Sequence, residues 1–550
     1  MEGHCTTNRS PEAFSTVPCF STGLDGLKLR VPELRAAPNP LFARVSCMRQ
    51  ALSRSMSSAL LLVLVVFATP LHGQERSNGL LAEGTPFETA WHAYDSGVPG
   101  PTVLVTGGIH GNEPAGARAA AQIASWTVAR GRLIVVPRCN PPALAERTRR
   151  LPGLEGDAGD LNRHFPRRGD AVDAPVSEQA DRIWSFVLDR EPDVLLDLHE
   201  GYGVRAAGSK SVGSSVLTAR DEDQDHQQVM LAAINSEIDD PMRRFSEIDS
   251  VVNGSLARAA IEQLGIEAHI LETTYADQPL STRARQHRRM VAALLTELGM
   301  SDHGPARMVR PSETRPAVAL YDGPGAGGDS QGRLFERVLE ECVVERIGAA
   351  DVRDGVLGQF DVVLFPGGSG SKQGGALGVD GRDRVRSFVS SGGGYIGVCA
   401  GAYLALHNYT WGLKLLPLDS FDREHWRRGK GTVRMEATGS GASTLGLEAG
   451  IECDIHFAQG PLMVPSKDSD LPEPRILSYY RTGVGKNGAD PETMVDTPAI
   501  VAGEFGSGRV LLFSPHPEKT EGLEALVLRA VRWEMRLSEP TAVPAGVGLN

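Results

Sequence analysis

The stretch TVLVTGGIHGNEPAGARAAAQIASW, residues 102–126, decides the fold of the first half of the chain. Its β-branched start predicts a buried strand, its glycines predict a tight turn, and its alanine-rich end predicts a helix. His110 and Glu113 lie in the turn, at the carboxyl end of the expected strand, where open α/β sheets build their sites. Together they can bind zinc, but a catalytic zinc site needs a third protein ligand and an open position for water.

Two further apolar runs supply residues that complete such a site. In EPDVLLDLHEGYG, residues 191–203, the expected strand ends in His199, and Asp197 lies on the same face, placed to orient an imidazole. In GIEAHILETTYAD, residues 265–277, Glu272 leaves an apolar run. A carboxylate there can take a proton from a metal-bound water and pass it to a leaving amine. Each residue alone is more often a cap or a surface residue, so the combination carries the prediction.

A basic segment lies between these strands. In GDLNRHFPRR, residues 159–168, Asn162 and Arg163 follow one another. A guanidinium matches a carboxylate bidentately, and a neighbouring amide adds a donor, so the pair is suited to anchoring an acidic group of a substrate. Upstream, Arg149 and Arg150 add two cations. Such an arginine group is usually a solvated face when nothing else accompanies it.

Four motifs, HGNE, DLNR, DLHEG and LETT, in this order and spacing, resemble the zinc carboxypeptidase superfamily, and most of all its succinylglutamate desuccinylase and aspartoacylase branch. The resemblance covers about residues 79–300. It implies one Zn²⁺ held by His110, Glu113 and His199, with Glu272 as general base and acid. It also implies that Asn162 and Arg163 hold the substrate carboxylate. Arg149 would polarise the scissile carbonyl, and the adjacent Arg150 leaves that assignment open.

The substrate stays open between two kinds of amide. Desuccinylase-like enzymes cleave an N-acyl amide from an amino acid, whereas carboxypeptidases remove a C-terminal residue. Both hold a carboxylate. The style of the motifs favours hydrolysis of N-acyl amino acids, with a carboxypeptidase acting on peptides or wall fragments as the alternative. The expected partner is therefore a small molecule or peptide with a free carboxylate.

The second half of the chain carries a cysteine between a strand and a helix. In SGGGYIGVCAGAYLAL, residues 391–406, Cys399 follows the strand-like GYIGV, and Gly397 and Gly401 permit a sharp turn. This is the layout of a nucleophile elbow. A helix N-terminus stabilises a thiolate. The alternative is a buried structural cysteine.

Two more strand ends complete the cysteine site. In RVLLFSPHPEKTEGLE, residues 509–524, a strand leads to His516 and Glu518. A cysteine, a histidine and a carboxylate that orients the imidazole form the triad that activates a thiolate. In FDVVLFPGGSGSKQG, the backbone N–H groups of Gly367 and Gly368 are placed to form an oxyanion hole. The segments 453–463 and 478–488 are expected to line the pocket.

The motifs LFPGG, GVCAGAYLA and HPE resemble class I glutamine amidotransferase-like domains, most closely the domain at the N-terminus of some biotin protein ligases. The resemblance implies that Cys399, His516 and Glu518 form the triad of a flavodoxin-like domain. Hydrolysis, as in a glutaminase, is the expected chemistry.

The predicted fold class is therefore α/β with two domains. A zinc-carboxypeptidase-like mixed-sheet domain is followed by a flavodoxin-like, class I glutaminase-like domain, in agreement with 550 residues and a prior of roughly 150 residues per domain. The predicted segments are a disordered or over-extended start at 1–47, a signal peptide at 48–73, the first domain at 79–300, a linker at 301–315, the second domain at 316–536 and a tail at 537–550.

The predicted signal peptide rests on MRQALSRSMSSALLLVLVVFATPLHGQ, residues 48–74. Two arginines precede a short apolar core, and small residues follow, as in a secretory signal. The core is shorter than the about 20 residues of a membrane span, so no stable membrane anchor is expected. The sequence predicts an exported protein, periplasmic or secreted. A buried N-terminal helix is the alternative.

Charge and cysteine content exclude other classes. The net charge of −12 and the lack of a long Lys/Arg cluster argue against nucleic-acid binding. Cys139, Cys342, Cys399 and Cys453 are too scattered for a disulfide framework or a metal knuckle. Two rival hypotheses remain: a binding protein that keeps both folds without their activities, and a cysteine hydrolase targeted by the first domain.

Overall fold

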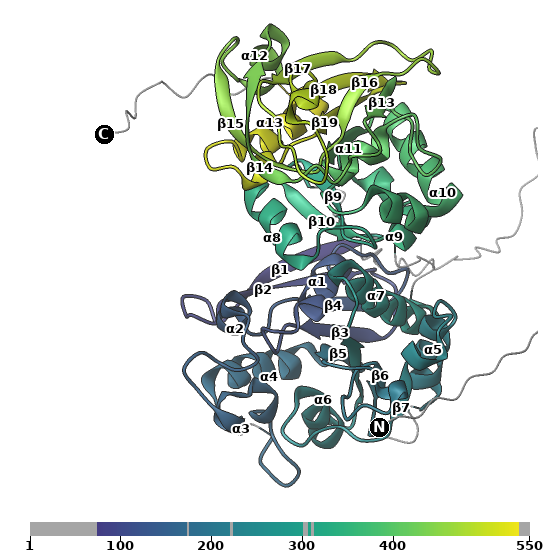
Figure 1. Cartoon of the computed structure of the whole chain (residues 1–550). Helices are drawn as coiled ribbons and strands as arrows, with labels where there is room; N and C mark the ends of the chain where they lie inside the picture. The colour runs from purple at the N-terminus through teal and green to yellow at the C-terminus, as the bar shows by residue number, and fades with distance from the viewer. Residues whose placement is uncertain (1–73, 173–174, 220–223, 301–305, 310–312, 538–550) are drawn as a thin grey trace, which may run out of the picture. The chain divides into compact units, whose positions relative to one another are not determined.

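The computed structural model describes residues 74–172, 175–219, 224–300, 306–309 and 313–537. Within them, one β-sheet lies before residue 300 and a second lies after residue 316 (Figure 1). The expected signal peptide and the segment before it lie outside the described residues, as do most of the linker and nearly all of the tail. The predicted domain bounds stay predictions.

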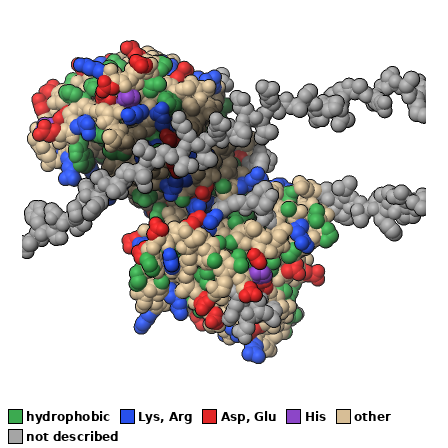
Figure 2. All heavy atoms as spheres, turned by 90° about the vertical axis from the view of Figure 1, so that its right-hand side faces the viewer, with side chains coloured by type: hydrophobic (Ala, Val, Ile, Leu, Met, Phe, Trp, Pro, Cys, Tyr) green, Lys and Arg blue, Asp and Glu red, His purple; other side chains and the backbone are tan. Residues whose placement is uncertain are grey.

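No helix among the described residues is both long enough and apolar enough to cross a membrane. Side chains of both charge signs are intermixed over the face of the molecule shown in Figure 2.

The first sheet has eight described strands in the order β1-β2-β4-β3-β5-β8-β6-β7. Strands β4, β3, β5 and β8 run parallel. Strand β2 pairs antiparallel with β1 and β4, and β6 pairs antiparallel with β8 but parallel with β7, so the sheet is mixed as expected. The strands are β1 (Glu75–Leu81), β2 (Thr89–Asp95), β3 (Thr102–Gly107), β4 (Arg132–Val136), β5 (Val194–Gly201), β6 (Ser215–Leu217), β7 (Ser246–Ile248) and β8 (Glu267–Thr274).

Helices cover both faces of this sheet, which explains why β3 and β5 are almost entirely apolar. Val103, Val105 and Leu196 pack against α1, α5 and α7, and the alternate residues Leu104 and Leu195 pack against α4 and α6. The helices are α1 (Pro114–Ile123), α2 (Pro141–Glu146), α3 (Gly156–Gly159), α4 (Glu178–Arg190), α5 (Gln224–Asn235), α6 (Leu256–Ala259) and α7 (Leu280–Glu297).

The strand order reverses at β3. The chain passes from β3 to β4 on one side of β3, and later places β5 on the other side. Ligands of open α/β sheets bind at such a switch point, beside the carboxyl ends of the strands. Helix α1 starts at this point and packs very closely, because a Cβ on Gly116 would lie 2.2 Å from the Leu198 carbonyl oxygen. The glycine fixes the distance between α1 and the end of β5.

The second sheet has nine described strands in the order β10-β9-β11-β12-β19-β18-β17-β14-β15. Strands β10, β9, β11, β12 and β19 are parallel in the 2-1-3-4-5 order of flavodoxin-like folds, as expected. An antiparallel half, which was not predicted from the sequence, extends the sheet beyond β19.

The strands of the second sheet are β9 (Ala317–Tyr321), β10 (Val343–Ile347), β11 (Val362–Phe365), β12 (Gly394–Val398), β14 (Lys430–Ala437), β15 (Glu452–Ala458), β17 (Arg475–Tyr480), β18 (Pro498–Phe505) and β19 (Gly508–Phe513). A separate two-stranded sheet pairs β13 (Leu418–Phe421) with β16 (Leu462–Pro465).

Helices α9, α10 and α11 pack on one face of the parallel half, and α8 and α13 pack on the other. These helices and α12 are α8 (Asp329–Val338), α9 (Ala349–Arg353), α10 (Gly370–Ser390), α11 (Ala400–Ala405), α12 (Gly439–Leu445) and α13 (Ala525–Glu534). The predicted strand before Cys399 coincides with β12. Cys399 therefore lies between a buried strand and a buried helix.

Candidate functional site

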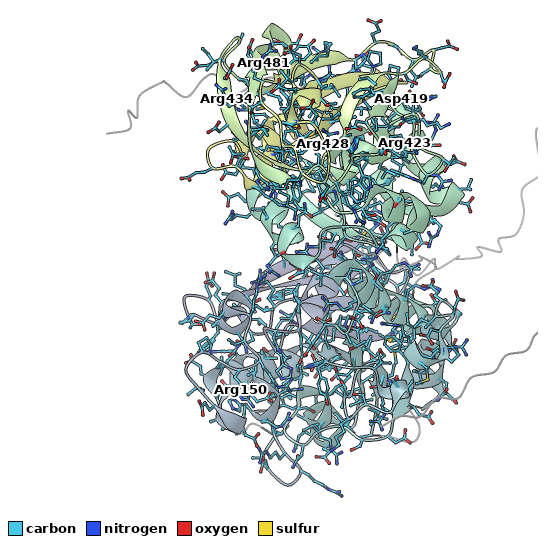
Figure 3. All side chains as sticks on the ribbon, in the orientation of Figure 1. Arg150, Asp419, Arg423, Arg428, Arg434 and Arg481 are labelled. Atoms are coloured by element: carbon cyan, nitrogen blue, oxygen red, sulfur yellow. The ribbon has the colours of Figure 1, made fainter. Side chains whose placement is uncertain are left out.

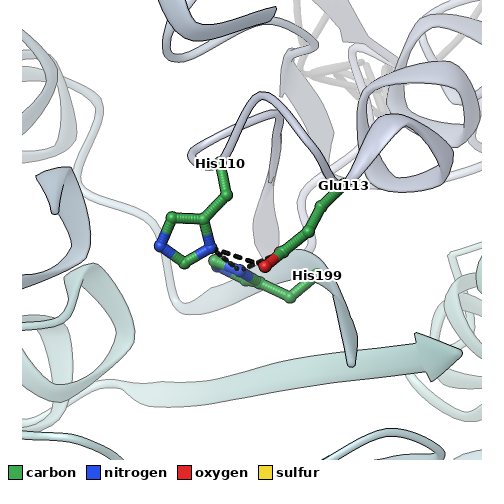
Figure 4. A group of neighbouring side chains, drawn as sticks. All are labelled: His110, Glu113 and His199. Carbon is green, nitrogen blue, oxygen red and sulfur yellow. Dashed lines mark hydrogen bonds and ion pairs between the residues drawn. The ribbon is translucent and has the colours of Figure 1, made fainter. Parts of the chain in front are cut away.

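Three side chains meet at the switch point of the first sheet (Figure 4). His110 Nδ1 lies 2.9 Å from Glu113 Oε1, and His199 Nδ1 lies 3.0 Å from Glu113 Oε2. The two Nδ1 atoms are 3.2 Å apart. The residues are only 2%, 3% and 2% exposed for His110, Glu113 and His199. Of the described residues, this is the one His, Cys, Asp or Glu group whose ligand atoms all lie within 4.8 Å of one another.

The far side of each imidazole faces a carboxylate. His110 Nε2 lies 2.8 Å from Asp160 Oδ1, and His199 Nε2 lies 2.8 Å from Asp197 Oδ2. A carboxylate only accepts, so each Nε2 donates, and in the neutral ring each Nδ1 then presents a lone pair. Two lone pairs and the Glu113 carboxylate therefore point at one place. This donor set fits zinc, and carboxylates that orient the ligating imidazoles are typical of zinc sites.

The electrostatics of the site favour positive charge. Burial alone would lower the pKa of His110 and His199, but the carboxylates of Glu113, Asp160 and Asp197 raise the pKa of both rings. Although burial opposes it, the two imidazoles hold the pKa of Glu113 well below its usual range. The surroundings of the three residues therefore stabilise a cation between them.

Asp197 was expected to orient an imidazole, and the geometry confirms this contact. Its second oxygen, Oδ1, accepts a hydrogen bond of 2.8 Å from Thr106 Oγ1 on β3. Asp160, which orients the other imidazole, was not singled out from the sequence. It precedes the short helix η1 (Leu161–Arg163), and its Oδ1 also accepts a bond of 3.1 Å from Asn162 N. The aspartate of the DLNR motif was the available signal.

Glu272 lies on the strand next to His199. The two residues are paired in the parallel register of β5 and β8, so their side chains lie on the same face of the sheet. Glu272 is 8% exposed, and its Oε2 makes no hydrogen bond with any described residue. Burial, together with the charge of Glu113, raises the pKa of Glu272 to about 8. A carboxyl group that exchanges a proton near neutral pH suits general acid–base catalysis.

The structure separates the two adjacent arginines. Arg149 reaches the centre, with its NH1 2.8 Å from Glu113 Oε1 and its NH2 3.3 Å from Asp160 Oδ2. Arg150, labelled in Figure 3, instead donates from Nε to the Gly156 carbonyl oxygen at 3.0 Å. Arg149 is therefore the one of the pair placed to contact a bound substrate.

Asn162 and Arg163, which are expected to anchor a substrate carboxylate, are partly engaged in contacts within the protein. Asn162 Oδ1 accepts a bond of 3.1 Å from Leu256 N at the start of α6, which fixes the carboxamide. Arg163 donates from NH1 to the Asn162 carbonyl oxygen at 2.8 Å, and its NH2 lies 3.9 Å from Asp160 Oδ2. The Arg163 side chain is partly exposed and makes only this long contact to a carboxylate among the described residues.

A buried ion pair beside the site was missed from the sequence. Glu200, next to His199, pairs with Arg283 of α7, and its Oε2 accepts a bond of 2.7 Å from Ala115 N in the first turn of α1. The Glu200 backbone N–H also donates to Glu113 Oε2 at 3.1 Å. Glu200 thus holds both α1 and a candidate ligand in place. The signal was the glutamate of DLHEG, but its partner is 83 residues away.

In the second sheet, Cys399 occupies a strained turn. Its φ of 51° and ψ of −96° lie outside the regions that side-chain-bearing residues usually adopt, as at a nucleophile elbow. The expected glycines are necessary, because a Cβ on Gly401 would lie 2.0 Å from the Phe365 carbonyl oxygen and one on Gly397 would lie 2.6 Å from Gly401. The thiol is thus presented at the carboxyl end of β12.

His516 and Glu518 lie beside this thiol. His516 Nδ1 is 2.7 Å from Glu518 Oε1, and both residues are buried. The other ring nitrogen, Nε2, makes no hydrogen bond with any described residue. A Cβ on Gly367 would lie 2.8 Å from His516 Cε1 and 3.6 Å from Cys399 Cβ. Gly367, His516 and Cys399 therefore meet at one place. Burial opposes charging, but Cys399 and Glu518 raise the pKa of His516 to about 9.

The expected pocket is only partly as predicted. Gly367, Gly368, Cys399 and His516 line one cavity, with Ala458 and Gln459 from the segment 453–463. The segment 478–488 contributes no described residue to the cavities at Cys399, so that prediction was wrong. This segment begins in the last residues of β17, whereas the cavity lies at the ends of β11, β12 and β15.

Comparisons with known families support the class expected for each half of the chain. Residues 99–298 match the model of the succinylglutamate desuccinylase/aspartoacylase catalytic domain, and residues 317–416 match the model of the N-terminal part of biotin-protein ligase. The chain therefore joins a domain of the desuccinylase/aspartoacylase catalytic class to a domain of the biotin-protein ligase N-terminal class. The second match contains Cys399 but ends before His516 and Glu518.

Individual relatives are similar over part of the chain. The N-alpha-acetyl-L-2,4-diaminobutyric acid deacetylase of Halomonas elongata is 43% identical over 105 residues, which are 18% of this chain and 29% of the relative. The chain thus matches less than a third of that protein's length.

Two solved structures are also similar. The cell shape determinant Csd4 of Helicobacter pylori in its tripeptide-bound form is 19% identical, with a TM-score of 0.32, over 46% of this chain and 67% of that one. A succinylglutamatedesuccinylase/aspartoacylase of Rhodobacter sphaeroides is 22% identical, with a TM-score of 0.31, over 43% and 69%.

Proposed function

We propose that the first domain is a zinc-dependent hydrolase of amide bonds in N-acyl amino acids. The observation that carries the proposal is the convergence of His110, Glu113 and His199, with each imidazole oriented by a carboxylate. Bound zinc would activate the attacking water and polarise the amide carbonyl. One Zn²⁺ per chain fits the three ligands and leaves a position for water.

The residues around the ligands supply the remaining steps. Glu272 takes a proton from the attacking water and delivers it to the nitrogen that leaves, and its raised pKa suits both transfers. Arg149, within reach of Glu113, offers its guanidinium to the carbonyl oxygen as charge develops there. Arg163 binds the carboxylate of the substrate, and the Asn162 amide group adds a donor.

The experiment for this proposal is a metal analysis of the purified protein combined with a substrate panel. We expect about one zinc per chain and hydrolysis of N-acyl amino acids with a free carboxylate, and much weaker hydrolysis of their methyl esters. Release of C-terminal residues from peptides, without deacylation, would make the domain a carboxypeptidase. A protein that does not bind zinc and does not turn over either class of substrate would instead be a binding module.

We further propose that the second domain is a glutaminase-like cysteine hydrolase. The Cys399 sulfur attacks an amide carbonyl carbon, a thioester bond forms, and the C–N bond breaks as the amine leaves with a proton from His516. Water then attacks the thioester with His516 as base, which regenerates the thiol. Glu518 orients the imidazole, and the N–H groups of Gly367 and Gly368 stabilise the oxyanion.

We also propose export. The mature chain then begins between about residues 69 and 76, because a short apolar core followed by small residues is cut rather than retained. Mass spectrometry of the periplasmic or secreted fraction measures the first residue. Recovery of the uncut N-terminus from the cytosol alone would show that the apolar segment is not a signal.

A further inference from the structure

Two cavities meet at Cys399. One has a volume of about 440 Å³ and the other about 430 Å³, and Cys399, Gly368, Ala458 and Gln459 line both. We call the first the aromatic arm and the second the basic arm. Each arm alone lies within the roughly 300–1,000 Å³ of pockets that hold a drug-sized molecule. The thiol therefore lies at the junction of a site much larger than free glutamine needs.

The aromatic arm is built for a flat apolar group. Tyr409 and Trp411 stack with their ring centroids 4.3 Å apart, and Tyr403 and Trp426 line the same cavity. The guanidinium of Arg423, labelled in Figure 3, lies 4.7 Å from the centre of the Tyr409 ring. Aromatic side chains in this number favour a ligand that can stack or pack against a ring.

The basic arm is built for an anion. Lys430 and Lys519 line it, and among the described residues that line either arm there is no aspartate or glutamate, in a chain whose net charge is −12. Gln331, only 6% exposed, also lines it, and its Nε2 has no hydrogen-bond partner among the described residues. A Cβ on Gly367 would lie 3.0 Å from that Nε2, which places the amide beside the triad. A buried donor without a partner is costly unless a ligand accepts from it.

The position of His516 orients the substrate. His516 lines the basic arm but not the aromatic arm. Because the imidazole gives its proton to the departing nitrogen, the amine half of the substrate lies in the basic arm and the acyl half lies in the aromatic arm.

We propose that the Cys399 site hydrolyses an extended amide, in which an aromatic or flat apolar acyl group is joined to an amine that carries carboxylate groups, rather than free glutamine. This inference rests on the cysteine chemistry proposed above. The thiolate forms the thioester with the acyl group, the anionic amine leaves with a proton from His516, and water releases the acid.

The test compares N-benzoylglutamate, N-acetylglutamate, N-ethylbenzamide and glutamine, and counts only hydrolysis that is lost in Cys399→Ser. We expect kcat/KM for N-benzoylglutamate to exceed that for glutamine by about 100-fold. Trp426→Ala should lower it about tenfold for the benzoyl but not the acetyl compound. Lys519→Ala should raise KM about tenfold for N-benzoylglutamate and leave N-ethylbenzamide unchanged. Lys467→Ala, exposed and outside both arms, is the matched control.

The outcomes separate the inference from the chemistry on which it rests. Hydrolysis of glutamine at least as fast as N-benzoylglutamate would overturn the inference and leave the cysteine hydrolase standing. If none of the four compounds gives Cys399-dependent hydrolysis, the hydrolase proposal fails. Protection of Cys399 against iodoacetamide by N-benzoylglutamate but not by glutamine would then still support the ligand class, and no protection would overturn it.

Discussion

Glu272→Gln protein keeps about one zinc per chain while its hydrolysis of N-acyl amino acids falls by roughly 10²-fold to 10⁴-fold. Glutamine preserves the size of the side chain beside His199 but cannot exchange a proton. The carboxyl group is free for this task because its Oε2 has no hydrogen-bond partner among the described residues. Metal content by mass spectrometry and turnover on the same preparation give the result.

The ligand variants behave differently. His199→Ala removes one of three protein ligands, so metal and activity should be lost together. Asp277→Asn is the matched control for Glu272→Gln, because Asp277 follows β8 on the same chain segment as Glu272 and is exposed. This control protein should keep its zinc and its activity. Zinc loss in Glu272→Gln, or a His199→Ala protein with full metal and full activity, would contradict the assignment of ligand and proton carrier.

Iodoacetamide at a pH of about 6 alkylates Cys399 ahead of Cys139, Cys342 and Cys453. Burial raises the pKa of Cys139 well above its usual range, that of Cys342 to about 11, and that of Cys453 above its ordinary value. These three thiols therefore contain almost no reactive thiolate. Cys399 instead lies beside His516, which is itself paired with Glu518, at the carboxyl end of β12. Tryptic mass spectrometry reports the labelling of each cysteine.

His516→Ala should slow alkylation of Cys399 by at least about tenfold at this pH, because the stabilising cation is gone. The pKa of His516 sets the direction of the pH dependence. This pKa is about 9, so the imidazolium is present below that pH and lost above it. The advantage of the wild type should therefore shrink as the pH rises past about 9. Equal labelling of all four cysteines, or none at Cys399, would make Cys399 a structural residue.

The sequence predicted that His110, Glu113 and His199 lie close together, because strand ends are local features. The runs before His110, His199 and Glu272 are largely apolar, and they become β3, β5 and β8. Parallel strands end at one edge of a sheet, so residues at those ends converge without further information.

The parts that were missed depend on distant contacts. Asp160 orients His110 from a loop 50 residues away, and Glu200 pairs with Arg283 of α7. No local pattern shows which carboxylate finds which cation. The same holds for the segment 478–488, which has aromatic and glycine residues but begins in β17, separated from β12 in the sheet by β19 and β18.

The backbone at Cys399 carries a trade-off between stability and chemistry. A residue with a side chain at φ 51° is strained by about 1–2 kcal/mol, whereas glycine adopts such angles without that strain. Glycine at this position would make the turn easier to form and would remove the thiol. The cysteine hydrolase proposed above therefore needs this strained turn to place a thiol at the carboxyl end of β12.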